Sequence, residues 1–204
     1  MKGQTKIQLS SYEMELINNA GLILTKNAIL EKVQQLLENL LNSQQQYIQS
    51  NISNLPTEVL LSSPKISKGE NYKGLPYRVL DYPRYFDKEN IFAIRTMFWW
   101  GNFFSITLHL SGRYKKEAEK KIIASRPELI KSNFYLCIHE KEWEHHFEND
   151  NYIPVGKLNK TAFKIQIMNK PFIKLAQKIS LKKWNDAQKI LISNYKQIIT
   201  MLRV

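Results

Sequence analysis

The stretch IFAIRTMFWWGNFFSITLHLS, residues 91–111, decides the fold of this chain. Strand-favouring residues run on both sides of Gly101-Asn102, a dipeptide that tolerates the positive φ angles of a two-residue turn. The stretch therefore predicts a β-hairpin. With the turn at these two residues, Trp99 is expected opposite Phe104.

Arg95 is the unusual residue of this hairpin. The same register places it opposite Leu108 on the more apolar face, and a slip of one residue would move it to the other face. A buried guanidinium needs partners, because an unpaired buried charge is very costly. Two interpretations stay open: a structural ion pair with a carboxylate such as Asp81 or Glu89, or an anion-binding arginine in a pocket.

The segments around the hairpin predict an α+β fold. Ser10 to Glu13 fits a capping box that starts a short helix, which Gly21 interrupts. An apolar stripe then predicts a long helix from about Lys26 to Gln49. Three more strands are expected at 77–82, 134–138 and 162–168, a helix at 115–131, and a last helix capped by Ser180 with its apolar stripe docked and its lysines outward.

These elements add up to an antiparallel sheet of four to five strands built on the central hairpin, with N-terminal helices, one inserted helix and C-terminal helices. We expect a single domain over residues 1–204. It would comprise a helical N-terminal segment (10–50), a sheet region (76–168) and basic C-terminal helices (171–203).

The net charge of +12 is concentrated at one end of the chain. Residues 157–204 contain ten lysines and Arg203 against Asp186 alone, a net charge of +10. An acidic protein or nucleic acid would therefore meet this region. We expect weak, sequence-independent binding through the basic C-terminal helix that falls steeply with salt. The chain has 24 lysines and only 6 arginines, although arginine is the better reader of phosphates and bases.

Several functional classes are disfavoured. No apolar run approaches the roughly 18 residues of a membrane span, and the N-terminus lacks the apolar core of a signal peptide. The single cysteine, Cys137, lies in an apolar run and is expected to be buried in a reducing compartment, which indicates a cytoplasmic protein. Phosphate-loop, dinucleotide-binding, nucleophile-elbow and HExxH motifs are missing from the sequence. The sequence favours a binding or adaptor protein over an enzyme.

Residues 139–146, HEKEWEHH, form the densest polar cluster. Imidazole and carboxylate groups suit a divalent metal, which makes a metal-assisted hydrolase or nuclease the alternative function. The candidate ligands are His139, Glu142, His145 and His146. Their spacing fits no standard motif, so a distant residue would have to complete the site. The other interpretation is a solvated, charged loop.

The polar face of the hairpin offers a candidate small-molecule pocket. It would combine polar and aromatic side chains: Ser105, Thr107 and His109 with Phe98, Trp100 and Phe103. The alternative is a face covered by one of the long helices, with His109 hydrogen-bonded inside. The candidate residues for binding a ligand or an anion are Arg95, His109, Trp100, Arg78 and Arg84.

A third candidate site is the segment that precedes the hairpin. Basic and aromatic residues alternate there: Lys65, Lys68, Tyr72, Lys73, Tyr77, Arg78, Tyr82, Arg84 and Tyr85. This composition is typical of surfaces that stack and neutralise single-stranded nucleic acid.

Overall fold

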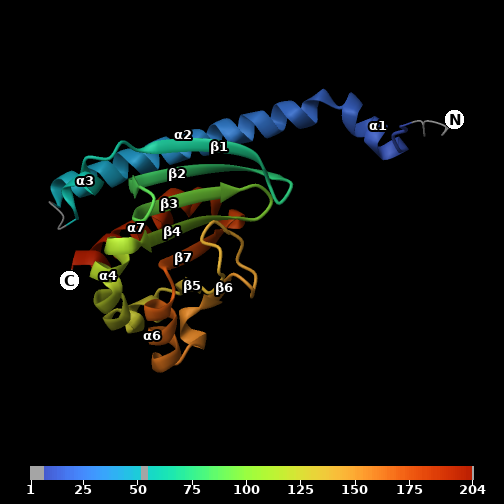
Figure 1. The fold of residues 1–204 in the computed structure, drawn as a ribbon. Coiled ribbons are helices and arrows are strands. Elements are labelled where there is room, and N and C mark those ends of the chain that lie inside the picture. Colours follow the sequence, from blue (N-terminus) through green and yellow to red (C-terminus); the bar gives the residue numbers. More distant parts are fainter. Residues whose placement is uncertain (1–6, 52–54, 204) are drawn as a thin grey trace.

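A seven-stranded antiparallel sheet forms the body of the protein in a computed structural model that describes residues 7–51 and 55–203 (Figure 1). The strand order is β1-β2-β3-β4-β7-β5-β6. The strands are β1 (Lys65–Tyr72), β2 (Leu75–Phe86), β3 (Ile91–Trp99), β4 (Phe103–Ser111), β5 (Tyr135–Cys137), β6 (Tyr152–Pro154) and β7 (Phe172–Ser180). The α+β class and the antiparallel sheet are confirmed, but the sheet is larger than expected, because β1, β6 and β7 are additional strands and two of them, β1 and β7, lie outside residues 76–168.

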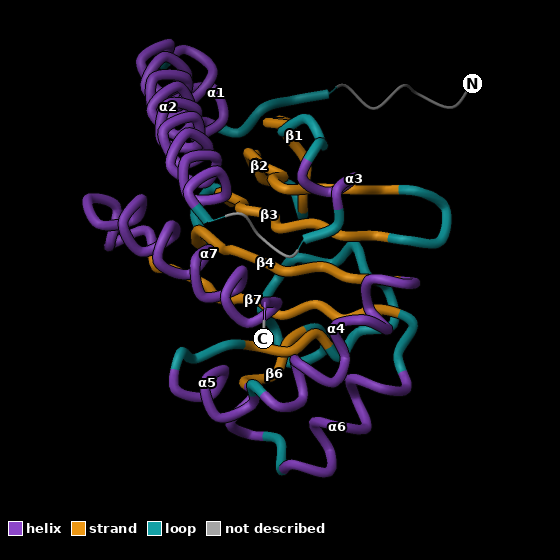
Figure 2. The backbone as a smooth tube through the Cα atoms, turned by 90° about the vertical axis from the view of Figure 1, so that its left-hand side faces the viewer, coloured by secondary structure: helices purple, strands orange, loops and turns teal. Residues whose placement is uncertain are grey.

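Helices precede, interrupt and follow the strands. They are α1 (Ser11–Asn18), α2 (Ala20–Ser50), α3 (Thr57–Leu60), α4 (Gly112–Ala124), α5 (Arg126–Lys131), α6 (Lys160–Asn169) and α7 (Ala187–Arg203), with 3-10 helices η1 (Val155–Lys157) and η2 (Leu181–Asp186). Figure 2 shows α2 and α7 side by side along one face of the sheet. Within the described ranges, no helix combines the length and the apolar character needed to cross a membrane.

The central hairpin is confirmed, but its expected register is wrong. Trp99 pairs with Phe103, and the connecting loop has three residues rather than two. Gly101 in that loop has φ +71°, a left-handed conformation that glycine adopts without a steric penalty. One extra loop residue shifts every cross-strand pair. Arg95 is therefore opposite Thr107 and not Leu108, so it shares a face with His109.

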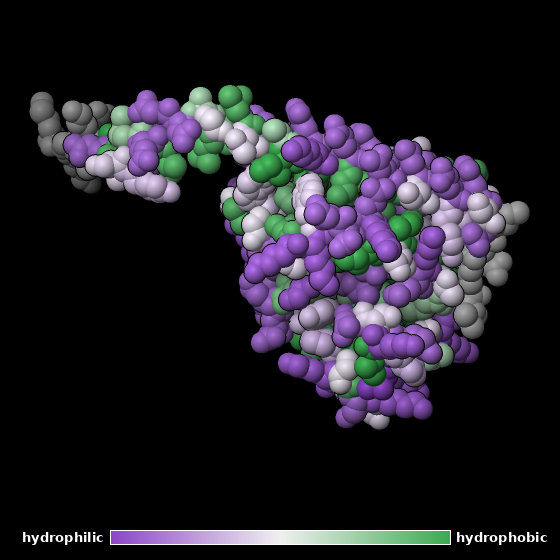
Figure 3. All heavy atoms as spheres, turned by 180° about the vertical axis from the view of Figure 1, so that it is seen from behind, coloured by the Kyte–Doolittle hydropathy of each residue, from purple (hydrophilic) through white to green (hydrophobic). Residues whose placement is uncertain are grey.

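The N-terminal helices follow the expected pattern with one difference. Ser10 and Glu13 form the capping box at the start of α1. The break falls at Asn19, which ends α1 and caps α2, while Gly21 lies inside α2. Figure 1 shows α1 and the first turns of α2 extending beyond the sheet, and Figure 3 shows hydrophobic side chains along this arm.

Two expectations near the C-terminus are wrong. Residues 162–168 form helix α6 instead of a strand, because Asn159 caps the helix and Phe163 and Ile167, four residues apart, face the core. Residues 172–180, expected to be helical, form strand β7 between β4 and β5. The last helix is confirmed: Ser180 caps η2, which leads into α7.

The two faces of the sheet are covered differently. The helix-covered face packs apolar strand residues against α2, α4 and α7 in one large core. In α7, Leu191, Tyr195 and Ile198 are fully buried, while the lysines at 178, 182, 183, 189 and 196 are exposed. The opposite face carries two smaller apolar clusters and is covered by residues 138–151, which we name the covering loop.

Candidate functional site

Two lysines at and just before strand β7 hold the covering loop in place by hydrogen bonds to its backbone. Lys174 on β7 is 1% exposed, and its Nζ donates to the carbonyl oxygens of Glu142 (2.7 Å) and Glu144 (2.6 Å). Burial lowers the pKa of Lys174 to about 8. Lys170 Nζ donates to two carbonyls where the loop begins (2.6 and 2.9 Å). These bonds satisfy carbonyl groups that would otherwise lack partners in a segment without regular structure.

Tyr72, at the end of β1, fastens the middle of the loop. Its hydroxyl oxygen accepts the backbone N–H groups of His145 (2.8 Å) and His146 (3.1 Å), and the hydroxyl donates to Glu144 Oε2 (3.0 Å). Burial raises the pKa of Tyr72 to about 12, so the phenol keeps its proton at neutral pH. The two histidines are thereby held in fixed positions over the sheet.

Arg95 forms the ion pair that one of the two interpretations required. Its Nε and Nη2 donate to Asp81 Oδ1 (2.8 Å) and Oδ2 (2.9 Å) in a bidentate pair across β2 and β3. Its Nη1 lies 3.3 Å from His145 Nε2. Because a guanidinium can only donate, His145 accepts through Nε2. Burial, together with the positive charges of Lys174 and Arg95, holds the pKa of His145 well below its usual range.

His109 makes a second polar pair beneath the loop. Its Nε2 lies 3.0 Å from Glu142 Oε2, and the rings of Trp143 and Phe172 pack edge-on against the imidazole. Burial lowers the pKa of His109, and the bond to His109 lowers the pKa of Glu142. His109 is thus hydrogen-bonded inside, as one interpretation expected, but a loop covers it and not a long helix.

A cleft opens between the covering loop and strands β1 to β3. It has a volume of about 240 Å³ and is lined by Ser67, Tyr72, Tyr77, Val79, Arg95, Met97, Trp143 and His145. Three of these side chains are aromatic, and Arg95 supplies a cationic group whose side chain is 19% exposed. The cleft therefore combines apolar walls with a few oriented polar groups, which is typical of small-molecule sites.

Of the five candidate ligand-binding residues, Arg95 alone lines this cleft. Trp100 lies on the helix-covered face, beside α2, so the pocket that was to combine it with His109 does not form. Arg78 approaches Glu70 (3.5 Å), and Arg84 donates to the carbonyl of residue 63 (2.9 Å). Arg78 lies opposite Phe98 and so faces the other side of the sheet from Arg95, whereas Arg84 lies opposite Ala93, beyond a register shift in β2.

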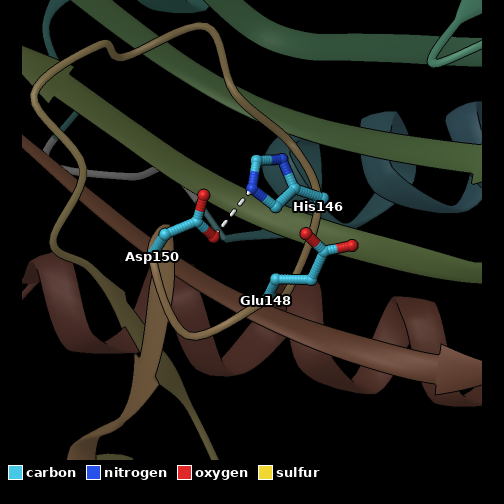
Figure 4. Close-up of side chains that lie close together, drawn as sticks. All are labelled: His146, Glu148 and Asp150. Atoms are coloured by element: carbon cyan, nitrogen blue, oxygen red, sulfur yellow. Dashed lines mark hydrogen bonds and ion pairs between the residues drawn. The ribbon is translucent and has the colours of Figure 1, made fainter.

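The four candidate metal ligands have four different partners. His139 accepts from the backbone N–H of residue 141 (2.9 Å), Glu142 pairs with His109, and His145 pairs with Arg95. His146 Nε2 lies 3.1 Å from Asp150 Oδ1, and Figure 4 shows Glu148 beside this pair. Among the described residues, His146, Glu148 and Asp150 are the group whose ligand atoms lie close enough to share a metal ion.

The aromatic residues before the hairpin do not form one surface for stacking bases. Tyr72 and Tyr77 pack on the loop-covered face, whereas Tyr82 is 6% exposed within the helix-covered core. Cys137 is buried as expected, and burial raises its pKa.

Reasoning from the sequence missed the role of two residues that hold the covering loop, Lys174 and Tyr72. Lys174 was assigned to a helix, although Phe172, Lys174 and Ala176 alternate with the apolar residues between them as a strand predicts. Tyr72 was assigned to the basic and aromatic segment before the hairpin, and no local pattern indicated its contacts more than 70 residues away.

A comparison of this chain with protein-family models, with curated proteins and with solved structures finds no match. The function is therefore inferred from the geometry of the residues themselves.

Proposed function

We propose that the protein binds a small organic carboxylate in the cleft beneath the covering loop. The orientation of Arg95 is the observation that supports this proposal most directly. Asp81 and His145 together engage three of the five N–H donors of the guanidinium, which leaves two donors for a ligand. An arginine held in a fixed orientation by a carboxylate is well suited to bind a second, planar carboxylate.

The walls of the cleft support a small ligand with a flat apolar part. Tyr77 and Trp143 offer aromatic surfaces on two sides. The volume of about 240 Å³ lies below the range of about 300–1,000 Å³ that is common for ligand pockets. A ligand of one ring or a short chain would fit this space.

The polar groups of the cleft support binding more than acyl transfer. Ser67 and His145 both line the cleft, but no hydrogen bond joins them, and the His145 Nε2 atom is engaged by Arg95. A serine without a base within hydrogen-bonding distance is a weak nucleophile. We therefore place this protein among binding proteins.

Fluorine NMR on protein labelled with 5-fluorotryptophan tests the proposal. Trp143 lines the cleft, whereas Trp100 and Trp184 belong to the helix-covered core and act as internal controls. A panel of aromatic and short aliphatic monocarboxylates is titrated into the protein. At least one compound is expected to shift the Trp143 resonance in a saturable way without moving the resonances of the two controls.

Two matched arginine variants complete this experiment. Arg95→Lys keeps the charge but loses the planar fork, and it should weaken binding about ten-fold or more. Arg78→Lys, at an arginine that pairs with a carboxylate away from the cleft, should bind like the wild type. A panel that leaves Trp143 unmoved, or equal binding by Arg95→Lys and the wild type, would contradict the proposal.

The exposed lysines of the C-terminal region support a second, weaker interaction with an acidic protein or nucleic acid. Lys182, Lys183 and Lys189 point to solvent while the apolar stripe of α7 is docked. Attraction of this kind acts through counterion release and decreases steeply with ionic strength. Weak polyanion binding through this region stays a prediction.

A further inference from the structure

We propose that His146, Glu148 and Asp150 bind a divalent cation of the zinc type and thereby tie the end of the covering loop together. His146 is 3% exposed, whereas both carboxylates lie at the surface. One ligand atom from each of the three side chains lies within 4.8 Å of the others. Figure 4 shows the imidazole directed toward Asp150, with the Glu148 side chain beside it.

The ring nitrogen of His146 that faces away from Asp150, Nδ1, lies close to two polar side chains. Tyr72 Oη lies 3.2 Å from Nδ1, and Glu144 Oε2 lies 3.4 Å from it. The single Tyr72 proton is directed at Glu144, and the Tyr72 oxygen already accepts two backbone N–H groups. One imidazole nitrogen thus faces the Glu144 carboxylate, and the other, Nε2, faces Asp150 Oδ1.

The spacing of His146 Nε2 and Asp150 fits two ligand atoms of one cation. His146 Nε2 and Asp150 Oδ1 lie 3.1 Å apart. Two ligand atoms that are each about 2.1 Å from a zinc ion lie about 3.0 to 3.4 Å from one another at the angles common in such sites. Glu148 has an exposed side chain whose present ion pair with Lys73 is long, 3.5 Å, so it can turn toward the same ion.

The ligand set favours a transition metal over magnesium or calcium. One imidazole with two carboxylates suits zinc, whereas all-oxygen sites suit the harder cations. Glu144 Oε2 lies 3.4 Å from Nδ1, which places a carboxylate at the second nitrogen, where metal-binding histidines commonly have one that orients the ring. These contacts assign Glu144 and Tyr72 a positioning role in the site.

This inference does not depend on ligand binding in the cleft, because the three metal ligands do not line it. Tyr72 is shared by both sites: it lines the cleft, and its hydroxyl contacts His146. A bound cation would connect His146 to the turn before β6, where Asn151 already donates to the His146 carbonyl (2.6 Å). The proposed role of the ion is to hold this part of the loop in place.

Zinc titration of the full chain tests the site. Isothermal titration calorimetry is performed with ZnCl₂ on protein purified without a histidine tag and passed through a chelating resin. We expect one equivalent of zinc to bind the wild type. Glu148→Gln and Asp150→Asn change only exposed side chains, so the protein should stay folded, and each should weaken zinc binding about ten-fold or more.

The matched control is His139→Gln, a histidine of the same loop that is engaged by its own turn. It should bind zinc like the wild type. Circular dichroism checks the fold of every variant. Wild-type protein that binds no zinc, or Glu148→Gln and Asp150→Asn variants that bind it like the wild type, would overturn the proposal.

Discussion

The two faces of the sheet are buried by different kinds of contact. The helix-covered face is packed with apolar side chains, whereas the loop-covered face contains paired polar groups. The helix-covered face has fully buried apolar side chains from β2, β3 and β4: Leu80, Ile94, Phe104, Ile106 and Leu108. The loop-covered face buries titratable groups under the covering loop: Asp81, Arg95, His109 and Lys174. The first arrangement needs only close contact, whereas the second needs a partner for every polar atom.

We expect the helix-covered face to contribute most of the stability of the protein, and the loop-covered face to hold the polar groups that can bind a ligand. Helices bring continuous apolar stripes and satisfy their own backbone groups. A loop brings unpaired carbonyls, which Lys174 on β7 and Lys170 just before β7 satisfy. The loop-covered face can therefore hold an oriented arginine and a neutral histidine beside a cleft, which an apolar core cannot do.

The largest loss of stability is expected when a large side chain is removed from the core of the helix-covered face. Phe104→Ala removes a side chain with 0% exposure and should lower the free energy of unfolding by about 3–5 kcal/mol. Its neighbour Phe103 is partly exposed on the other face, so Phe103→Ala should cost about 1–2 kcal/mol. Urea denaturation measures both, and equal losses would contradict the contrast between the faces.

A somewhat smaller effect is expected from breaking the polar pair on the loop-covered face. Asp81→Asn leaves Arg95 without its carboxylate and should cost about 3 kcal/mol, near the lower end for buried ion pairs because the guanidinium keeps some contact with water. Replacing both partners, with Asp81→Asn and Arg95→Met together, should recover part of this loss. Urea denaturation of the double-mutant cycle measures the coupling, and additive losses would show that the pair contributes little.

The smallest effect is a dependence of stability on pH. It arises from a histidine on the loop-covered face and leaves the packing of both faces intact. The pKa of His145 is lowered in the folded protein, so the unfolded chain takes up a proton first as the pH falls below about 6.5. Stability should decrease from that pH downward and stay level just above it. His145→Gln should reduce the slope of the free energy of unfolding against pH by up to about 1.4 kcal/mol per pH unit, the value for one proton.

Denaturation curves collected between pH 5 and pH 7.5 check this prediction. Above pH 7 the wild type and the variant should differ by a constant amount, which acts as the internal control. An unchanged slope below pH 6.5 in His145→Gln would mean that other groups, such as His109 with its own lowered pKa, account for the dependence.

The sequence by itself determined the elements whose signals are local. The hairpin, the capping box at Ser10, the long helix α2 and the docked stripe of α7 all follow from patterns within one or a few turns of chain. The sequence also indicated that Arg95 needs partners, either a carboxylate such as Asp81 or Glu89 or a bound anion, and Asp81 is an observed partner. These features depend on propensity and pattern, which a short segment carries with it.

Only the tertiary structure decided which residues share a site. One extra loop residue moved Arg95 to the face of His109, because side chains in a strand alternate with a period of two. Strand β7 carries a local alternating pattern, but only its pairing with β4 and β5 placed Lys174 under the loop. The contacts of Tyr72, Arg95 and His146 join residues many positions apart, and no local pattern encodes such contacts, since they arise only when the sheet is assembled.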